Sequence, residues 1–162
     1  MLNSKNMTRI LLLVTLLFAN DIFAQKLESE FLYKISLSLD KPIDTGKSPF
    51  GTRIVHSVKG GTFEGPKMRG IVKAVGEDWL MKVDETTNRL DVRLVLETED
   101  GQLIACTYPG IVHTSADKTT YWRITPTFQT ASKKYEWLNY VIAVGKGSFQ
   151  DGLVTYEVFL IK

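Results

Sequence analysis

The chain after residue 24 is dominated by short runs in which hydrophobic and polar residues alternate. The run at 31–39, FLYKISLSL, shows the pattern clearly, because every odd position is apolar while Lys34, Ser36 and Ser38 share the other face. Side chains of a β-strand point to opposite faces in turn, so a period of two indicates a strand with one buried face. The run therefore predicts a half-buried antiparallel strand.

Further strands are expected wherever a similar run is bounded by Gly, Pro, Asn or Asp. The nine predicted strands cover residues 31–39, 52–58, 70–75, 79–83, 90–97, 103–108, 120–125, 138–144 and 153–161. Residues 40–50, which are rich in Pro and Gly, are predicted to form a loop. Turns are predicted at 59–61, 87–89 and 99–101, because Gly and Asn adopt the positive φ angles that tight hairpins need.

Many short strands joined by short turns predict one all-β domain. An open sheet of this size would expose long edges, so we expect it to close as a barrel or to pack as a two-sheet sandwich. A single antiparallel β-barrel of about eight to ten strands is the favoured architecture. Its lumen or mouth can receive one small ligand, whereas a sandwich usually fills its interior and binds through its end loops.

The first 24 residues follow a different pattern. Basic Lys5 and Arg9 precede an apolar run at 10–19, and the small residue Ala24 offers a site for signal peptidase. About ten apolar residues are too few to span a bilayer as a helix. We therefore expect a signal peptide at 1–24, a β-barrel domain at 25–162, and an exported protein, periplasmic or secreted, with no stable membrane anchor after cleavage. A retained N-terminal anchor or a buried helix is the alternative.

The composition narrows the classes of partner. The 162 residues are 44% hydrophobic and 23% charged, as in ordinary globular domains. Removal of residues 1–24 leaves 18 basic and 17 acidic residues. Nucleic-acid binding depends on clustered Lys and Arg, so this balance predicts no nucleic-acid partner. Cys106 is the only cysteine, which excludes an intrachain disulfide, and its apolar neighbours predict a buried, inert thiol.

Short motifs along the chain resemble those of the family catalogued as domain of unknown function 3237. They are GTRI at 51–54, GGTFEGP at 60–66 with Gly70, DW at 78–79, LDVR at 90–93, EDG at 99–101 with Ile104, YWR at 121–123 with Pro126 and Phe128, Tyr135 with WLN at 137–139, and YEV at 156–158. The resemblance implies a compact β-barrel with a poorly defined biochemical role. Many relatives have a longer insertion where this chain has only residues 111–120, and a signal peptide is not usual among them.

Three further motifs predict no chemistry of their own. The glycine-rich segment 60–66 lacks the Lys-Ser/Thr ending of a phosphate loop and is interpreted as turn or bulge geometry. His56 and His113 do not have the spacing of a metal site, so neither a metal nor another cofactor is expected. Ser115 and Lys118 match a Ser-x-x-Lys pattern without its companion motifs, which indicates a chance match.

Polar and aromatic residues within the predicted strands form the candidate site. Asp91 and Arg93 share one strand face, opposite the face that carries Leu90 and Val92. One interpretation buries the leucine face and leaves Asp91 and Arg93 as an exposed ion pair. The resemblance favours a polar lumen or mouth, because the family pattern retains these polar types. The candidate ligand-binding residues are Arg53, Arg93, Tyr121, Arg123, Trp137 and Asn139, and the candidate catalytic residues are Asp78 and Asp91.

If these side chains converge, their guanidinium groups can bind a carboxylate or enolate in an aromatic-lined cavity. We therefore expect an exported barrel that binds a small organic molecule with an anionic or carbonyl group. One alternative is a cofactor-independent lyase or isomerase in which Asp78 or Asp91 is the general base and Arg stabilises an oxyanion. The other is a non-catalytic interaction module that uses a sheet edge or loop end.

Overall fold

The computed structural model describes residues 26–162, and their all-β architecture agrees with the expectation from the sequence. The predicted signal peptide, residues 1–24, lies outside this range. The strands are β1 (Ser29–Leu39), β2 (Ile43–Ser48), β3 (Gly51–Glu64), β4 (Arg69–Val72), β5 (Gly76–Lys82), β6 (Thr87–Thr98), β7 (Leu103–Thr114), β8 (Thr120–Ile124), β9 (Thr127–Gln129), β10 (Ala143–Gln150) and β11 (Leu153–Ile161). A 3-10 helix, η1 (Glu136–Tyr140), precedes β10.

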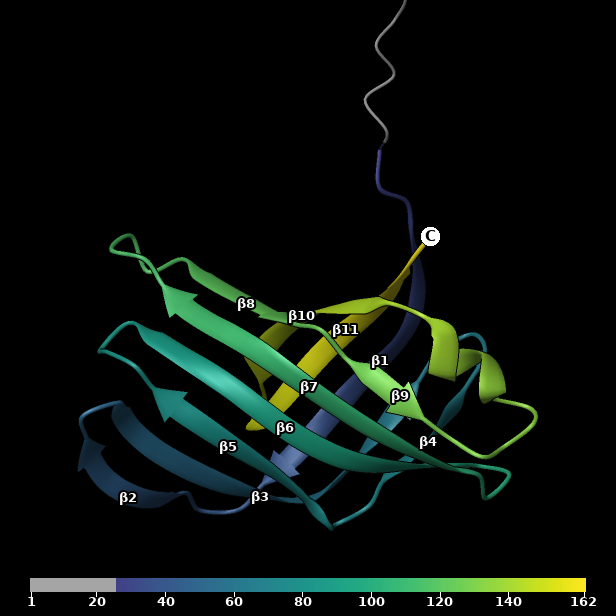
Figure 1. Cartoon of the computed structure of the whole chain (residues 1–162), viewed down its shortest axis with the longest axis horizontal. Helices are drawn as coiled ribbons and strands as arrows, with labels where there is room; N and C mark the ends of the chain where they lie inside the picture. The colour runs from purple at the N-terminus through teal and green to yellow at the C-terminus, as the bar shows by residue number, and fades with distance from the viewer. Residues whose placement is uncertain (1–25) are drawn as a thin grey trace, which may run out of the picture.

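Eight strands close into a ring whose neighbours are all antiparallel (Figure 1). The ring runs β3–β5–β6–β7–β8–β10–β11–β1 and closes where β1 pairs with β3. The short strand β4 lies between β3 and β6, as β5 does, and pairs with the C-terminal parts of both strands. Closure satisfies the backbone groups that an open sheet would leave at its edges. The expected barrel is therefore confirmed.

Strand β6 illustrates how the sequence directs one face into the barrel. Leu90, Val92 and Leu94 are buried, whereas the intervening Asp91 and Arg93 are exposed. The same alternation makes every second residue of the neighbouring strands contribute to the core. Apolar burial on one face and hydration of charges on the other both favour this register, since a slip by one residue would exchange the two faces.

Two of the three predicted turns differ from the expectation and one agrees with it. The turn expected at 59–61 lies within β3, where a Cβ on Gly61 would clash with the carbonyl oxygen of Ser36 in β1. The glycine thus serves close strand packing, and a register irregularity beside it bends the wall. The turn expected at 87–89 is the start of β6. The turn at 99–101 is confirmed, with Gly101 at φ 76°.

Two predicted segments also have different secondary structure. Residues 40–50, expected to form a loop, contain the fully exposed strand β2, which pairs with β3. Residues 138–144, expected to be one strand, are divided between η1 and the start of β10. An exposed strand buries no face and a short helical turn has no long period, so alternation detects neither.

Aromatic residues fill one end of the barrel. The ring of Tyr33 lies edge-on to Phe63 and Phe128, with centroids 5.8 and 6.2 Å away. Cys106 is buried beside this cluster, and its Sγ lies 4.0 Å from the Tyr33 hydroxyl. Burial raises the pKa of the thiol to about 12. This end of the barrel is therefore a packed core, and the expected burial of the cysteine is confirmed.

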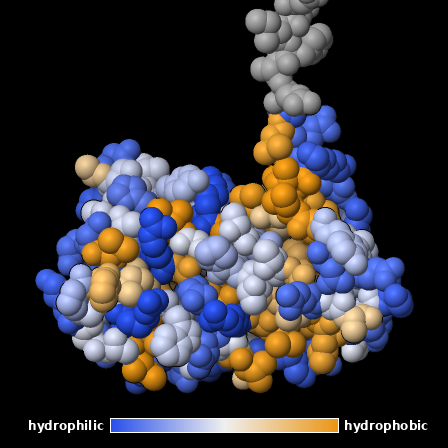
Figure 2. Space-filling view, viewed as in Figure 1, coloured by the Kyte–Doolittle hydropathy of each residue, from blue (hydrophilic) through white to orange (hydrophobic). Residues whose placement is uncertain are grey.

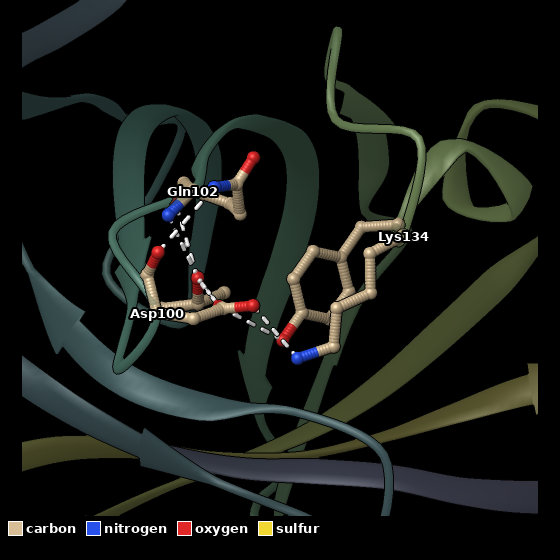
Figure 3. A network of polar contacts seen from close by, with 5 residues as sticks. Asp100, Gln102 and Lys134 are labelled. Carbon is tan, nitrogen blue, oxygen red and sulfur yellow. Dashed lines mark hydrogen bonds and ion pairs between the residues drawn. The ribbon is translucent and has the colours of Figure 1, made fainter.

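A polar network holds the loop before η1 against the β6–β7 turn at the same end (Figure 3). Asp100 pairs with Lys134 (2.7 Å), accepts the Tyr135 hydroxyl (3.2 Å) and accepts the hydroxyl of Thr98. The Thr98 hydroxyl in turn accepts the backbone amide of Gln102 at 2.9 Å. The hydrogen bonds from Lys134 and Thr98 lower the pKa of Asp100 to about 2. The network thereby holds η1 and the loop before it, here called the cap, over the packed end of the barrel.

The outer surface mixes hydrophilic residues with separate hydrophobic clusters on the face shown in Figure 2. Within residues 26–162, no helix has the length and apolar character that a membrane crossing requires.

Candidate functional site

The other end of the barrel encloses a cavity of about 280 Å³. All eight strands of the ring contribute to its lining, so the cavity is the lumen of the barrel. Its volume is close to the lower end of the usual range for small-molecule pockets, roughly 300 to 1,000 Å³. Most of the lining is aliphatic, and the residues with polar atoms are His56, Asp78, Asn88, Tyr108, Trp122 and Tyr156.

The cavity lining reaches strand positions beside the β5–β6 and β7–β8 turns, and these two turns lie at the left of Figure 1. Asn88 follows the β5–β6 turn, Val112 precedes the β7–β8 turn, and both are half-buried. Phe149, at the end of β10, lines the cavity and is 67% exposed. The deeper residues Val92 and Tyr156 are 2% exposed. The cavity lining is therefore exposed at Phe149 and deeply buried at Val92 and Tyr156.

His56 and Asp78 form the most polar part of the lumen wall. They are direct partners on β3 and β5, and both line the cavity. Directly opposed residues on antiparallel strands have Cβ atoms roughly 4.5 to 5.5 Å apart. Nδ1 of His56 is nevertheless buried without a hydrogen-bond partner among the described residues. An orphaned buried nitrogen of this kind is costly, so a ligand that hydrogen-bonds to it gains affinity.

Asp78 is only 9% exposed and is the one carboxylate in the lumen lining of the described chain. Its Oδ1 accepts the backbone amide of Asp91 at 3.3 Å. The pKa of Asp78 is raised to about 6, mainly because the carboxyl is buried; the hydrogen bond from the Asp91 amide and the charge of Arg53 oppose the shift, and the charge of Asp91 adds to it. A carboxyl that titrates near neutral pH can both accept and return a proton.

Three aromatic residues form the wall that β7, β8 and β11 contribute. The ring of Tyr156 lies edge-on to Tyr108 and to Trp122, with centroids 5.6 and 5.5 Å away. Burial raises the pKa values of both tyrosines, so their hydroxyls stay protonated at neutral pH. Nε1 of Trp122 is buried and makes no hydrogen bond of good geometry within the described chain, although it lies close enough to the Tyr156 hydroxyl to lower the pKa of that group. Because an indole N–H only donates, it requires an acceptor oxygen or nitrogen.

The eight residues predicted to form one pocket do not converge, and this part of the prediction is wrong. Asp78 lines the lumen, but Asp91 and Arg93 point outward with side chains 55% and 66% exposed and a 3.5 Å ion pair between them. The leucine face of β6 is the buried one. The interpretation with an exposed charge pair is therefore the correct one for this strand.

The other predicted arginines lie on the outside of the barrel as well. Nη1 of Arg53 donates to the carbonyl oxygen of Trp79, and the Arg123 guanidinium stacks on Tyr121 with 4.7 Å between its carbon and the ring centroid. Tyr121 and Arg123 line a shallow outer groove over β7 and β8, whereas the intervening Trp122 faces the lumen. Among the described residues, the lumen lining contains no Lys or Arg, so a preference for an anion has no support there.

Trp137 and Asn139 lie on η1, so they do not share a strand face. Trp137 packs against the core with Lys67 Nζ 5.6 Å from its ring centroid. Asn139 exchanges hydrogen bonds with the backbone of Thr130, accepting from its N–H (2.8 Å) and donating to its carbonyl oxygen (3.1 Å). Both residues hold η1 and the loop before it against the barrel. Neither lines the lumen, so their contact with a ligand stays a prediction.

Sequence reasoning missed His56, Tyr108, Trp122 and Tyr156 as lumen residues. The alternation of the strands could have identified them. Each lies an even number of positions from a buried aliphatic residue on its own strand and so shares that residue's face, as His56 does with Val58. No cluster of three or more His, Cys, Asp or Glu side chains within residues 26–162 is arranged to hold a metal ion.

Comparison with known proteins gives consistent matches. The family model described as "Protein of unknown function (DUF3237)" matches residues 27–161. A UPF0311 protein of Rhodopseudomonas palustris is 23% identical over 145 residues, which cover 82% of this chain and 95% of that protein. A β-barrel-like protein of Acinetobacter baumannii is 32% identical, with a TM-score of 0.81 over 88% of this chain and 100% of its own. A structure described as an enzyme from Penicillium herquei is 25% identical, with a TM-score of 0.70 over 84% of this chain and 95% of its own.

Proposed function

This chain belongs to the DUF3237 family of proteins of unknown function, and on that premise we propose that its barrel binds a small, largely apolar organic molecule in the lumen. The observation that carries the proposal is the cavity of about 280 Å³, open at one end and bordered by two buried nitrogens without partners, His56 Nδ1 and Trp122 Nε1. Apolar walls supply affinity, and a few convergent polar groups orient the ligand.

The chemistry of the lining indicates a neutral molecule with an acceptor such as a carbonyl oxygen. The Trp122 indole N–H needs an acceptor, which a ketone, ester or lactone supplies. A carboxylate ligand would bring a second negative charge into a low-dielectric cavity beside Asp78, which opposes binding. We therefore keep the expectation of a carbonyl-bearing ligand and propose a neutral ligand in place of an anionic one.

Two observations bear on the alternatives. The buried carboxyl of Asp78 favours a cofactor-independent lyase or isomerase as a second candidate, and the similarity to a Penicillium herquei protein described as an enzyme is compatible with it. An interaction module would rely on a continuous exposed apolar surface, and on the face shown in Figure 2 hydrophobic residues are mixed with hydrophilic ones. The lumen is thus the better supported site.

Trp122 provides a direct test of binding. The other two tryptophans, Trp79 and Trp137, lie outside the lumen lining, so in a Trp79→Phe/Trp137→Phe variant the emission excited at a wavelength that tyrosine does not absorb comes from Trp122 in the lumen. Titration of this variant with the bicyclic ketones 2-tetralone and 1-indanone should give a saturable change in emission. Benzoate and 2-naphthoate should bind more weakly at pH 8 than these ketones. Native mass spectrometry of the purified protein should also detect any molecule retained from the host.

The binding proposal fails if none of these compounds changes the emission of Trp122 and no small molecule is retained. Tighter binding of the two carboxylates than of the ketones would contradict the neutral ligand class while leaving a lumen site in place.

We also propose that the barrel is exported, on the basis of the basic and apolar pattern of residues 1–24. Expression of the full chain in a secreting bacterial host should yield a product that starts at Gln25. N-terminal sequencing and intact mass of the periplasmic and medium fractions measure this, and a full-length cytosolic product would contradict it.

A further inference from the structure

The lumen holds more polar chemistry than binding of an apolar molecule requires. A carboxyl buried in an apolar cavity is unfavourable, and burial of the histidine and indole nitrogens without partners adds to the cost. An aliphatic lining of the same shape would bind an apolar ligand without these costs. The three groups therefore indicate a role in which a proton or a developing charge has to be handled.

We propose that the lumen catalyses proton transfer within a neutral carbonyl compound, with Asp78 as the general base and the Trp122 indole N–H as the donor to the carbonyl oxygen. This inference rests on the proposed function, since the substrate is the ligand class that the lumen binds. His56 is assigned a positioning role beside Asp78.

The two ends of the reaction are separated by the topology of the ring. Trp122 on β8 lies four strands from His56 on β3 in a ring of eight, so the two unpartnered nitrogens are on opposite walls. Asp78 is next to His56 on β5. A ligand that spans the lumen can thus present its carbonyl oxygen to Trp122 and an acidic C–H group to Asp78.

The chemical step needs no cofactor. The Asp78 carboxylate takes a proton from the carbon next to the carbonyl group, or from a carbon conjugated to it, so a C–H bond breaks and an O–H bond forms on Asp78. The electron pair of the C–H bond moves into a new C=C bond and the carbonyl π pair moves to oxygen, where the Trp122 N–H stabilises the enolate. Return of the proton to another carbon of the conjugated system shifts the double bond and restores Asp78.

The surroundings of Asp78 suit this cycle. The groups around it are His56 and Arg53 from β3, Asp91 from β6, Tyr108 from β7 and Tyr156 from β11. Burial raises the pKa of the Asp78 carboxyl to about 6, which makes it a stronger base than a solvated aspartate while leaving it ionised at pH 7.5. The protonated tyrosines add neutral polar groups to the aromatic wall without adding charge.

His56 acts on the orientation of the substrate. Because Nδ1 has no partner in the barrel, it is available to a polar atom of the ligand at the Asp78 end. Loss of this contact should leave the base intact but let the C–H group move out of line with the carboxylate. A side chain that keeps a hydrogen-bonding group at this position should restore part of the rate.

Deuterium exchange tests the proposal with simple ketones in place of the natural substrate. The wild-type protein is incubated in D₂O at pD 7.5 with 2-tetralone or 1-indanone, and incorporation at the carbon next to the carbonyl is measured by NMR spectroscopy. Asp78→Asn should reduce the protein-dependent exchange by about 100-fold, in line with the usual contribution of a general base. Glu77→Gln is the matched control, because Glu77 is the exposed neighbour of Asp78 on the outer face of β5.

Three further measurements separate catalysis from folding and from binding. The exchange rate of the wild type should rise through pH 6 and level off above it, as Asp78 ionises. His56→Ala should lower the rate and His56→Gln should recover part of it, while the dependence on pH stays centred near 6. Asp78→Asn should still bind the ketone, as measured through Trp122 emission.

Each outcome distinguishes the two proposals. Binding of the ketones without exchange above the buffer rate overturns the catalytic inference and leaves the binding function standing. Exchange that persists in Asp78→Asn, or that falls equally in Glu77→Gln, overturns the role of Asp78. Absence of both binding and exchange removes the proposed function and the inference together.

Discussion

His56 and Asp78 face each other across the β3–β5 pair, yet the buried Nδ1 of His56 has no hydrogen-bond partner among the described residues. The two polar side chains therefore border a space inside an otherwise apolar lumen. A paired histidine and aspartate would explain each other's burial. Here the two groups are not paired with each other: Asp78 accepts the backbone amide of Asp91, and His56 Nδ1 has no partner within the described chain, which is why the site supports a ligand and the reaction proposed for it.

Replacement of Asp78 by Asn should stabilise the barrel at high pH. The unfolded carboxyl titrates near pH 3.8 and the folded one near 6. Below pH 4 both states are protonated, so the carboxyl has no differential effect. Between pH 4 and 6 the unfolded state loses its proton first, so stability falls as pH rises, and above pH 6 the cost is complete at about 3 kcal/mol. Urea unfolding at pH 4 and pH 8 should show a gain for Asp78→Asn at pH 8 alone.

Glu77→Gln provides the comparison for that experiment, since Glu77 is exposed on the same strand and should change little at either pH. An Asp78→Asn variant that is destabilised at pH 8 would show that the carboxylate is satisfied in the folded state and would contradict its assignment as a raised-pKa group.

Trp122→Phe should weaken binding of 2-tetralone about 2- to 13-fold, which corresponds to the loss of one hydrogen bond of roughly 0.5 to 1.5 kcal/mol. Calorimetry of the wild type and the variant measures the difference. Arg123→Ala is the matched control, because Arg123 is the next residue on β8 and lies in the outer groove. Equal losses in the two variants would indicate that general loosening of β8, rather than the indole N–H, accounts for the effect.

Gly147→Ala should reduce the capacity of the lumen. A Cβ at Gly147 would lie 2.5 Å from the Cγ and Cδ2 atoms of Trp122, so the indole has to move. We expect at least about a tenfold loss of ketone affinity, since a misplaced indole loses its hydrogen bond and disturbs the apolar contacts. Ser148→Ala, one residue further along β10, should bind normally. Unchanged affinity in Gly147→Ala would show that Trp122 can move without affecting the site.

The polar network at the packed end should make stability depend on acid. The pKa of Asp100 is lowered from 3.8 to about 2 by Lys134, Thr98 and Tyr135, so its contribution is complete above about pH 4 and is lost as pH falls through 2. Thermal unfolding of Asp100→Asn should show a lower melting temperature than wild type at pH 6, with the difference shrinking toward pH 2. Glu99→Gln, which alters the adjacent acidic residue, should follow the wild type.

Alternation predicted the barrel because most of its strands bury one face, but it did not decide which face. On β6 the leucine face was the better choice from hydrophobicity alone, and the family resemblance shifted the prediction toward Asp91 and Arg93. Position in a motif does not report the direction of a side chain. On β8 the same motif sends Trp122 into the lumen and Arg123 to the outside.

The lumen residues were hard to identify for a related reason. His56 and Asp78 are 22 positions apart in the chain, and only the β3–β5 register makes them neighbours. Strand pairing was outside the reach of a single sequence, so no local pattern joined the two. Asp78 was found through its place in a motif, whereas His56 was considered only as a metal ligand, a role that its spacing from His113 did not support.

Chemical labelling of Cys106 can report how often the packed end of the barrel opens. The thiol is the only one in the chain and lies beside Tyr33, where bulky disulfide reagents cannot reach it in the closed barrel. Labelling by such a reagent therefore requires an excursion that separates the walls of the aromatic core. The labelling rate therefore reports how frequently the packed end opens. A ligand bound at the far end of the lumen should stabilise the closed barrel and slow the labelling.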